Sequence, residues 1–375
     1  MPSALRPDCR AKDRLRRWLP EVSLHANTSS SLPVGLTEHD IMLIRDTFEH
    51  AWADSTLEVY GSGLMAFHVM CDRRELAEQE RAPVRDITLQ YFIASLAGAY
   101  NGDTIRNYVY GVRAWHILHG VPWQRNKDEL ETLMRAALRL TPPSTRRKQR
   151  LPWTTDFLAA IQPKLDVDSP LGAAVWACAT VGFYSLARLG EITVPSIKDF
   201  TAQHHVARRH ARQETDRQGL AVWTIRLPTT KSAPSGENIS FARQDGVTDP
   251  EAALLAHFRI NNPGSDNALF TYQHADRRGR KRLRPLTKAQ FIKAIGDAAN
   301  RAAVDPLQGH GMRIGGTLEY LLRGTPFDVV KTMGRWQSDA FQLYLRKHAQ
   351  ILAPYLQRES STHGDFIRYT MPPVR

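Results

Sequence analysis

Residues whose types and spacing could do chemistry are few, and they lie in the second half of the sequence. Arg188 ends an uncharged stretch and is followed three residues later by Glu191, so both side chains share one face of a helix. His310 and Arg313 have the same spacing and can also point one way. Taken singly, the first pair is ordinarily an ion pair at a helix end. The second is ordinarily a structural histidine beside a surface arginine.

Two further residues extend this set. Lys231 follows an alternating run and precedes the turn 232–236, so it lies at a hairpin tip, where a solvated lysine is the ordinary interpretation. Tyr344 follows Gly334-Arg335-Trp336 on a late helix, where a core tyrosine is the default.

The first half shows helical periodicity from about residue 38 onward. It predicts helices over 38–52, 56–72, 87–99, 104–119 and 127–139. Thr37 with Asp40, and Ser55 with Glu58, have the spacing of capping boxes at the first two helices. Residues 1–36 mix arginines with a serine run and lack periodicity, which predicts a flexible basic arm with a short helix near Leu15.

The second half mixes helices with a small sheet. Thr141-Pro142-Pro143-Ser144 and the cations after it predict a basic linker over 142–152. Helices are predicted over 154–163, 171–187, 249–260, 288–302, 313–323, 326–335 and 338–346, and strands over 221–227 and 238–241. Thr325 is the expected N-cap of the helix that begins at Pro326. This domain covers 153–357, and a tail covers 358–375.

Composition limits the class of protein. A chain of 375 residues with 42% hydrophobic residues can bury a core in two domains. Lys and Arg total 50 against 38 Asp and Glu, a net charge of +12 that favours a nucleic-acid partner. Cys9, Cys71 and Cys178 are too scattered for a zinc ribbon or a disulfide framework, which indicates a reducing compartment. No secretion signal is evident, and the uncharged stretch 169–187 is interpreted as a core helix rather than a membrane span.

The order of the candidate residues is more telling than any one of them. This order resembles that of the tyrosine recombinase or phage-integrase superfamily. It runs from Arg with Glu, through Lys after a strand and His-x-x-Arg, to Gly-Arg-Trp and Tyr. The amino-acid sequence around His310 and Arg335 is similar to that of recombinases from eukaryotic mobile elements of the Crypton and DIRS types, especially fungal ones. The resemblance implies a mainly α fold with a small antiparallel β-sheet in the C-terminal half. It divides into a helical core-binding, SAM-like bundle over 37–141 and a mixed α+β catalytic domain of the DNA breaking-rejoining type over 153–357.

The resemblance also implies a site. The matching catalytic residues are Arg188, Glu191, Lys231, His310, Arg313 and Tyr344. One position departs from the family, which has a second histidine or a tryptophan nine residues before the tyrosine. Arg335 stands at that spacing and Trp336 one residue later, so both are candidates, and the count of nine favours Arg335 as a phosphate ligand.

The residue types suit metal-free and ATP-free phosphodiester exchange. Two arginines can clamp the dianionic transition state, and a tyrosine can hold the phosphate in a covalent 3′-phosphotyrosyl ester. In the family the hairpin lysine protonates the leaving 5′ oxygen. No Walker lysine motif, HExxH or carboxylate cluster is present in the sequence, and no cofactor is expected.

Basic segments fit a double-stranded DNA partner. The candidate DNA-binding residues are Arg146, Arg147, Lys148, Arg150, Arg277, Arg278, Arg280, Lys281, Arg282 and Arg284. Either segment could also be a nuclear import signal, so the expected location is the nucleus, or the cytoplasm for a prokaryotic protein. Family members act as dimers on one site and tetramers in synapsis. The apolar stripe from Ile351 to Leu356 could pack on a neighbouring protomer or on its own domain.

Three functions compete at this point. The first is DNA recombination or integration by a recombinase of a transposable element. The second is a type IB topoisomerase, which shares the chemistry but relaxes supercoils as a monomer. The third is a domesticated DNA-binding protein that has lost strand exchange.

Overall fold

The computed structural model describes residues 3–22, 37–145, 149–230, 233–276, 278–338 and 351. The chain divides into two compact units, Met1–Lys148 and Gln149–Arg375, and each is considered by itself. Their boundary falls inside the predicted basic linker, of which residues 146–148 lie outside the described ranges.

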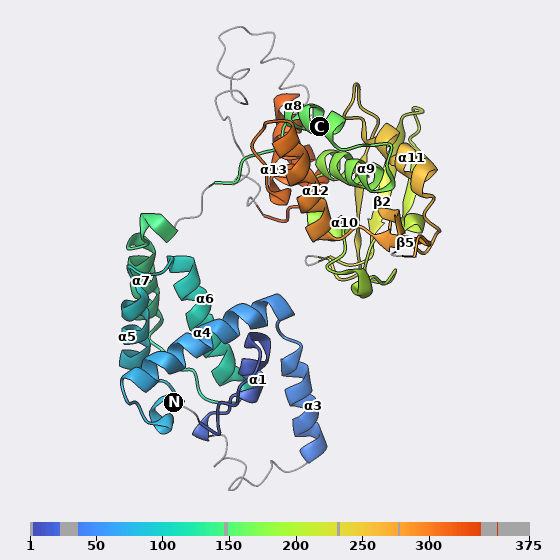
Figure 1. Ribbon diagram of the computed structural model, residues 1–375. Coiled ribbons are helices and arrows are strands. Elements are labelled where there is room, and N and C mark those ends of the chain that lie inside the picture. Colours follow the sequence, from blue (N-terminus) through green and yellow to red (C-terminus); the bar gives the residue numbers. More distant parts are fainter. Residues whose placement is uncertain are drawn as a thin grey trace, which may run out of the picture. The chain divides into compact units, whose positions relative to one another are not determined.

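The described part of the first unit is all α (Figure 1). Its main helices are α3 (Glu38–Glu49), α4 (Asp54–Arg73), α5 (Asp86–Leu96), α6 (Gly102–Leu118) and α7 (Lys127–Arg139). Short turns of 3-10 helix lie at Glu78–Glu80 and Pro143–Thr145. All five predicted helices are therefore confirmed.

One of the two predicted capping boxes exists. The Thr37 hydroxyl accepts a hydrogen bond from the backbone N–H of Asp40, and the Asp40 carboxylate accepts one from the backbone N–H of Thr37. The box at Ser55 is wrong, because α4 already begins at Asp54 and its N-cap is Ala53.

The amino-terminal segment differs from the predicted flexible arm. Residues 11–17 form a 3-10 turn (Ala11–Asp13) and the short helix α1 (Arg14–Arg17), which confirms the helix predicted near Leu15. The segment is not a free arm, however, because Leu15 and Trp18 are buried against α4 and α6. The Trp115 indole donates to the Trp18 carbonyl over 2.6 Å. Two buried apolar residues among many arginines show no periodicity, so the sequence pattern concealed this packing.

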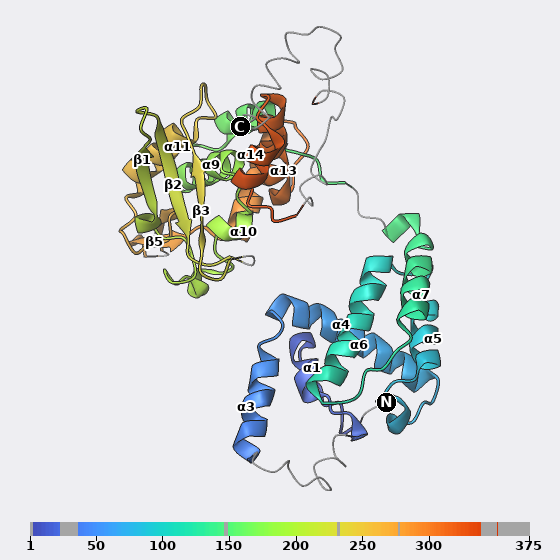
Figure 2. The same ribbon diagram turned by 180° about the vertical axis from the view of Figure 1, so that it is seen from behind.

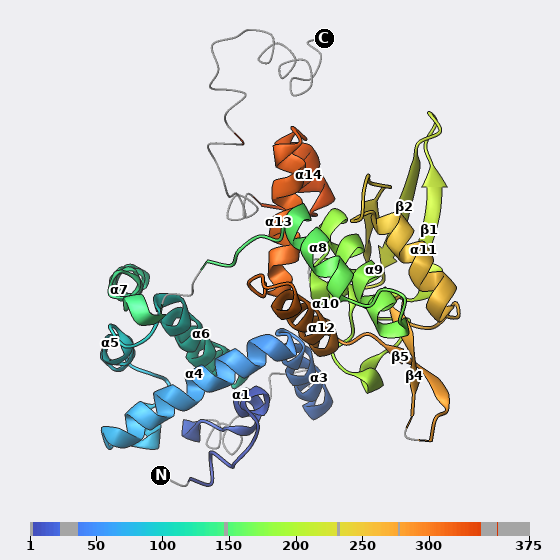
Figure 3. The ribbon, with the colours of Figure 1, turned by 45° about the horizontal axis from the view of Figure 1, so that its top comes forward.

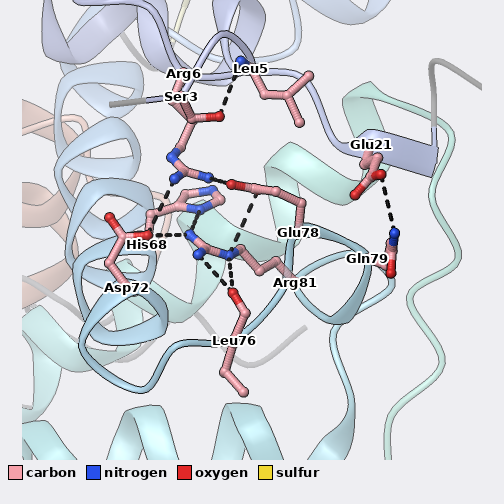
Figure 4. A network of polar contacts seen from close by, with 10 residues as sticks. All are labelled: Ser3, Leu5, Arg6, Glu21, His68, Asp72, Leu76, Glu78, Gln79 and Arg81. Atoms are coloured by element: carbon pink, nitrogen blue, oxygen red, sulfur yellow. Dashed lines mark hydrogen bonds and ion pairs between the residues drawn. The ribbon is translucent and has the colours of Figure 1, made fainter. Parts of the chain in front are cut away.

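Buried arginines fasten the same segment to the bundle (Figure 4). Arg6 pairs with Glu78 and with Asp72, the latter at 3.3 Å between Nη2 and Oδ1. Arg81 approaches Asp72 to 2.8 Å and also donates to the Leu76 carbonyl. The charges of Arg6 and Arg81 are thus matched by carboxylates beneath the surface, which is the condition for burying arginine.

The second unit combines helices with two small antiparallel sheets. Its helices are α8 (Thr155–Ile161), α9 (Pro170–Tyr184), α10 (Leu189–Ile192), α11 (Pro250–Asn261), α12 (Lys288–Arg301), α13 (Gly309–Leu322) and α14 (Phe327–Met333). Short 3-10 turns lie at Gln162–Lys164, Ile197–Asp199 and Arg208–His210. Its strands are β1 (Ala211–Thr215), β2 (Ala221–Leu227), β3 (Glu237–Phe241), β4 (Thr271–Ala275) and β5 (Lys281–Pro285).

The larger sheet has the order β1-β2-β3, and β4 pairs with β5 in a separate hairpin. Figure 2 shows α9 and α11 behind the larger sheet, where Trp223 of β2 packs against Phe258 of α11. The predicted strands β2 and β3 are confirmed. Strands β1, β4 and β5 were not predicted. β1 buries only its first residue, β4 buries its first two residues in succession, and β5 is basic, so none of them shows the alternation of a half-buried strand.

Helix α9 is the centre of the core, since nearly all of its residues are buried. This confirms that the uncharged stretch is a core helix. Within the described residues, none of the helices has the length and apolar character needed to cross a bilayer.

Helices α13 and α14 bring the late motifs onto this core. A side chain at Gly316 would overlap the Phe183 carbonyl, so its absence lets α13 pack tightly on α9. The predicted Thr325 cap is wrong, because α14 has Pro326 as its N-cap residue and no side-chain cap. The predicted helix 338–346 lies outside the described residues apart from its first position.

Candidate active site

The described candidate residues all belong to the second unit. Arg188 and Glu191 lie at α10, His310 and Arg313 in α13, and Arg335 just beyond α14. Lys231 and Tyr344 lie outside the described residues, so the structure leaves their predicted roles untested.

Arg188 follows the end of α9 and is the N-cap residue of α10. The Glu191 carboxylate accepts from the Arg188 backbone N–H at 2.9 Å and from Arg188 Nη1 at 2.6 Å. The predicted ion pair is therefore present. With 40% of its side chain exposed, Arg188 also has donors that a ligand can reach.

Arg313 is buried, contrary to the ordinary interpretation of a surface arginine. Its Nη1 donates to the Leu186 carbonyl at 2.7 Å, and its Nη2 donates to the Gly334 carbonyl. These carbonyls lie at the carboxyl ends of α9 and α14, where helix dipoles favour a cation. Arg313 thus joins two helix ends.

The Trp336 ring completes the surroundings of Arg313. The Arg313 guanidinium lies 4.3 Å from the centre of the ring, within cation–π distance. A side chain at Gly334 would overlap this ring, so glycine is needed there. Trp336 therefore lies against a predicted catalytic residue.

His310 is half-buried in the first turn of α13. Burial lowers the pKa of His310, and the charges of Arg150, Arg313, Arg188 and Lys288 lower it further. Both arginines of the predicted clamp therefore act on this imidazole. The site is electropositive and its histidine is neutral at neutral pH, which suits an anionic ligand and proton acceptance.

Arg335 has partners that the sequence did not indicate. Its Nη2 lies 2.7 Å from Glu191 Oε2 and its Nη1 lies 2.9 Å from Glu237 Oε1. Burial raises the pKa of Glu191, but the charges and hydrogen bonds of Arg335 and Arg188 outweigh burial and hold that pKa below its usual range. Glu191 is consequently ionised between two arginines.

Glu237 and Lys288 are the residues of this region that sequence reasoning missed. Glu237 opens β3 and Lys288 opens α12, so each is far in sequence from the motifs. No local pattern marks either of them, because only the fold brings them to the site.

The predicted basic segments lie at the surface where they are described. Arg278, Arg280, Lys281 and Arg282 are exposed, and Arg284 is half-buried. They belong to the β4–β5 hairpin, which projects from the unit in Figure 3. Asp276 pairs with Arg280 and Arg282 and offsets part of the charge.

The linker cations are described only in part. Arg150 is exposed and acts electrostatically on His310. Arg146, Arg147, Lys148 and Arg277 lie outside the described residues.

A second basic surface lies on the first unit and was not predicted. A groove of about 500 Å³ between α6 and α7 is lined by the cations Arg106, Arg113, Arg125, Lys127 and Arg135 together with Tyr110 and Trp123. Glu131 also lines the groove and pairs with Lys127, which offsets part of the charge. Arg106, Tyr110 and Arg113 have helical spacing on one face, which was an available signal. The cations of α7 could be joined to them only from the fold.

Tyr320 is the described alternative to Tyr344 as a nucleophile. Its hydroxyl donates to the Tyr184 carbonyl at 2.9 Å, and burial raises its pKa to about 12. A bonded phenol that resists ionisation is a poor nucleophile, so Tyr320 is a structural residue. Across the described ranges, no group of three or more His, Cys, Asp or Glu side chains could hold a metal ion.

No protein-family model and no curated protein matches the sequence. Among solved structures, the chain is similar to the site-specific recombinase XerH bound to a palindromic difH substrate in a post-cleavage complex. That likeness has a TM-score of 0.52 and 13% identity, and covers 95% of this chain and 99% of the XerH chain. The pre-cleavage complex of XerH with difH gives a TM-score of 0.50 and 13% identity over 96% and 100% of the two chains. The predicted fold class is confirmed: the chain has the fold of the tyrosine recombinases.

Proposed function

We propose that this chain cleaves and rejoins DNA strands at specific sites through a 3′-phosphotyrosyl intermediate. The observation that carries the proposal is the bond of Arg313 to the Leu186 carbonyl, two residues before Arg188, with His310 one helical turn before Arg313 on α13. The charges of both arginines act on the imidazole. A site of this composition binds a phosphate and has a neutral base beside it.

The two arginines stabilise the transition state. A phosphodiester under attack becomes a pentacoordinate dianion, and each guanidinium can donate to its non-bridging oxygens. Arg188 is accessible, whereas the position of Arg313 is fixed by two helix ends. This clamp supplies the positive charge that metal ions supply in other phosphoryl transfers, so we propose a reaction without metal or ATP.

Tyr344 is the proposed nucleophile. Its oxygen bonds to phosphorus as the bond to the 5′ oxygen breaks, which leaves a 3′-phosphotyrosyl ester and a free 5′ hydroxyl. His310 receives the phenolic proton, and Lys231 gives a proton to the leaving oxygen. Attack by a 5′ hydroxyl on the ester reverses both transfers and rejoins the strand.

The basic surfaces supply sequence-independent affinity for the duplex. The β4–β5 hairpin of the second unit and the α6–α7 groove of the first each collect cations that can contact phosphates. XerH, whose fold this chain has, is bound to its difH substrate in both complexes. We therefore propose double-stranded DNA as the partner of both units, with the first as the core-binding domain.

The amino-acid sequence of the motifs around His310 and Arg335 supports a more specific assignment of origin. We infer an origin in a mobile element of the Crypton or DIRS type, a nuclear location, a dimer on one site and a tetramer in synapsis. Ile351 is buried against Leu186, Leu318, Leu321 and Val330 of its own unit. The packing of Ile351 favours the own-domain alternative for the first residue of the apolar stripe.

The topoisomerase alternative has less support. The likeness to a site-specific recombinase extends over nearly the whole chain, including the helical first unit. The other alternative is a domesticated DNA-binding protein that has lost strand exchange. Only a measurement of catalysis separates this alternative from an active recombinase.

The test begins with selection of bound duplexes from a random pool, because the target site must be known first. A selected duplex is then nicked beside the cleavage point so that a short fragment diffuses away and traps the covalent ester. In EDTA and without nucleotide, we expect a protein–DNA adduct. A bound duplex without an adduct would support the domesticated alternative, and relaxation of plasmids lacking the site would support the topoisomerase.

A further inference from the structure

A chain of charged and polar side chains leads from Arg188 to the β2–β3 turn. Arg188 binds Glu191, Glu191 binds Arg335, and Arg335 binds Glu237, at N–O distances of 2.6, 2.7 and 2.9 Å. The Glu237 carboxylate then accepts from the Thr230 hydroxyl at 2.7 Å. Positive and negative groups alternate along this path, so each charge is neutralised by its neighbour.

The path is largely buried where it crosses between elements. The side chain of Arg335 is 8% exposed, that of Glu191 is 9% and that of Glu237 is 19%. Ion pairs shielded to this degree are screened less by salt and are sensitive to removal of one partner. The link therefore has a defined geometry, unlike a surface pair.

Thr230 is itself fixed at the base of the turn. Its backbone N–H donates to the Ala233 carbonyl, and its hydroxyl accepts from the Ala233 N–H, both at 3.0 Å. At the other side of the turn, Gly236 has φ of +82°, and a side chain there would overlap the Leu227 carbonyl. Glu237 thus binds a turn whose ends are already closed, and the residue that follows Thr230 in sequence is Lys231.

The backbone of Arg335 indicates that its side chain is needed. Arg335 has φ of +58°, a left-handed conformation that glycine adopts without strain and that costs other residues roughly 1 kcal/mol. It occupies the position after the end of α14 where glycine is usual, with its N–H bonded to the Thr332 carbonyl. The two ion pairs of the Arg335 side chain, with Glu191 and Glu237, give a reason for an arginine at this position.

We propose that Glu237 and Arg335 are positioning residues that tie Thr230, the residue before Lys231 in sequence, to the Arg188–Glu191 pair. They act on the proposed proton donor by fixing Thr230, and they do not themselves contact DNA. This inference rests on the proposed function. It also gives Arg335 a role other than the direct phosphate contact suggested by its spacing to Tyr344.

The test uses two nicked duplexes that differ in one atom. One has the natural 5′-bridging oxygen, and the other has sulfur, which leaves as a stable thiolate and needs no proton. A defect confined to proton donation is therefore rescued by sulfur. A defect in the phosphate clamp, such as that of Arg188→Ala, is not.

We expect Glu237→Gln to slow cleavage of the oxygen duplex by about 10-fold or more and to cleave the sulfur duplex within about 3-fold of wild type. Lys231→Ala should show the same pattern. Glu214→Gln is the matched control, because Glu214 also accepts from a threonine hydroxyl and pairs with an arginine, on strand β1. It should cleave both duplexes at the wild-type rate.

Thr230→Val removes only the hydroxyl that binds Glu237. It tests the same link if Glu237→Gln does not fold. It should show a smaller defect that sulfur also rescues. The inference would be overturned if Glu237→Gln were equally defective on both duplexes, or if Glu237→Gln cleaved the oxygen duplex at the wild-type rate. In either case, cleavage by the wild-type protein itself would still uphold the proposed function. If the wild-type protein forms no adduct with either duplex, the proposed function fails first.

Discussion

At the residue scale, Arg313 has the most demanding surroundings in the site. Its guanidinium is bonded to carbonyls of two helices and covered by an indole ring. A cation so enclosed stays in one orientation, which is what a transition-state donor requires. The ring of Trp336 therefore supports the proposed catalytic role of Arg313 by holding its guanidinium in place.

Substitution of Trp336 tests this support. Trp336→Ala removes the face that covers Arg313, and we expect cleavage to fall by about 10- to 100-fold with duplex binding nearly unchanged. Trp336→Phe retains an aromatic face and should stay within a few-fold of wild type. Single-turnover adduct formation measures both. A Trp336→Phe variant as slow as Trp336→Ala would show that the indole N–H matters, and not the ring face.

At the element scale, two helix ends create the site. Helices α9 and α14 both end with a left-handed residue, Leu186 and Arg335, and with a bond from the following N–H back into the helix. These endings turn the chain sharply and direct the two carbonyls that Arg313 binds. The orientation of the Arg313 side chain thus depends on how these two helices end.

Sequence reasoning succeeded where one element carries its own signal. The helices from α3 to α7 follow from periodicity, the core helix α9 follows from its long uncharged sequence, and the pairing of Arg188 with Glu191 follows from their spacing. Prediction failed for the packing of the amino-terminal segment and for β1, β4 and β5, whose few buried residues leave no alternating pattern. Glu237 could not be predicted, because its contact with Arg335 depends on the sheet and α14 meeting in space.

A buried pair on α11, His257 and Asn261, links this helix to α9 and β4 and makes the stability of the second unit depend on pH. His257 Nε2 donates to the Leu269 carbonyl at 2.9 Å, and its Nδ1 accepts from the Asn261 amide. That amide also donates to the Pro170 carbonyl, and its oxygen accepts from the Gln273 N–H, so it cannot turn over. His257 must therefore stay neutral in the folded state.

The sign of the pH effect follows directly. Burial lowers the pKa of His257 to about 4 from an ordinary 6.5, so between these values the unfolded chain binds the proton and the folded chain does not. Stability should fall as pH drops through this window, by about 3 kcal/mol in all. Denaturation at about pH 7 and about pH 5 should show that His257→Gln costs less at the lower pH. An equal cost at both would contradict the neutral assignment.

At the scale of the whole molecule, charge is the feature on which the proposed DNA binding depends most. The net charge of +12 is concentrated in part on the β4–β5 hairpin and in the α6–α7 groove. Cations that neutralise phosphates release counterions, so affinity must fall with salt. Each surface belongs to a different unit, and both are proposed to contact the duplex.

Salt titration measures this contribution. If about 8 phosphates are contacted, the slope of log affinity against log salt should be near −7. Replacing Arg278, Arg280 and Arg282 with alanine should make the slope less steep by about one for each phosphate that is no longer neutralised. A wild-type slope near zero would rule out the duplex model, and an unchanged slope in the triple variant would remove the hairpin from it.

The central claim is that Tyr344 becomes covalently joined to DNA, and the most direct measurement compares wild type with Tyr344→Phe on the nicked duplex. The wild-type protein should form a 3′-phosphotyrosyl adduct in EDTA without nucleotide, and peptide mapping should place the DNA on Tyr344. Tyr344→Phe should form no adduct yet bind the duplex within a few-fold of wild type, because binding rests on phosphate contacts elsewhere. An adduct that persists in Tyr344→Phe would contradict the assignment and direct attention to Tyr355 or Tyr369.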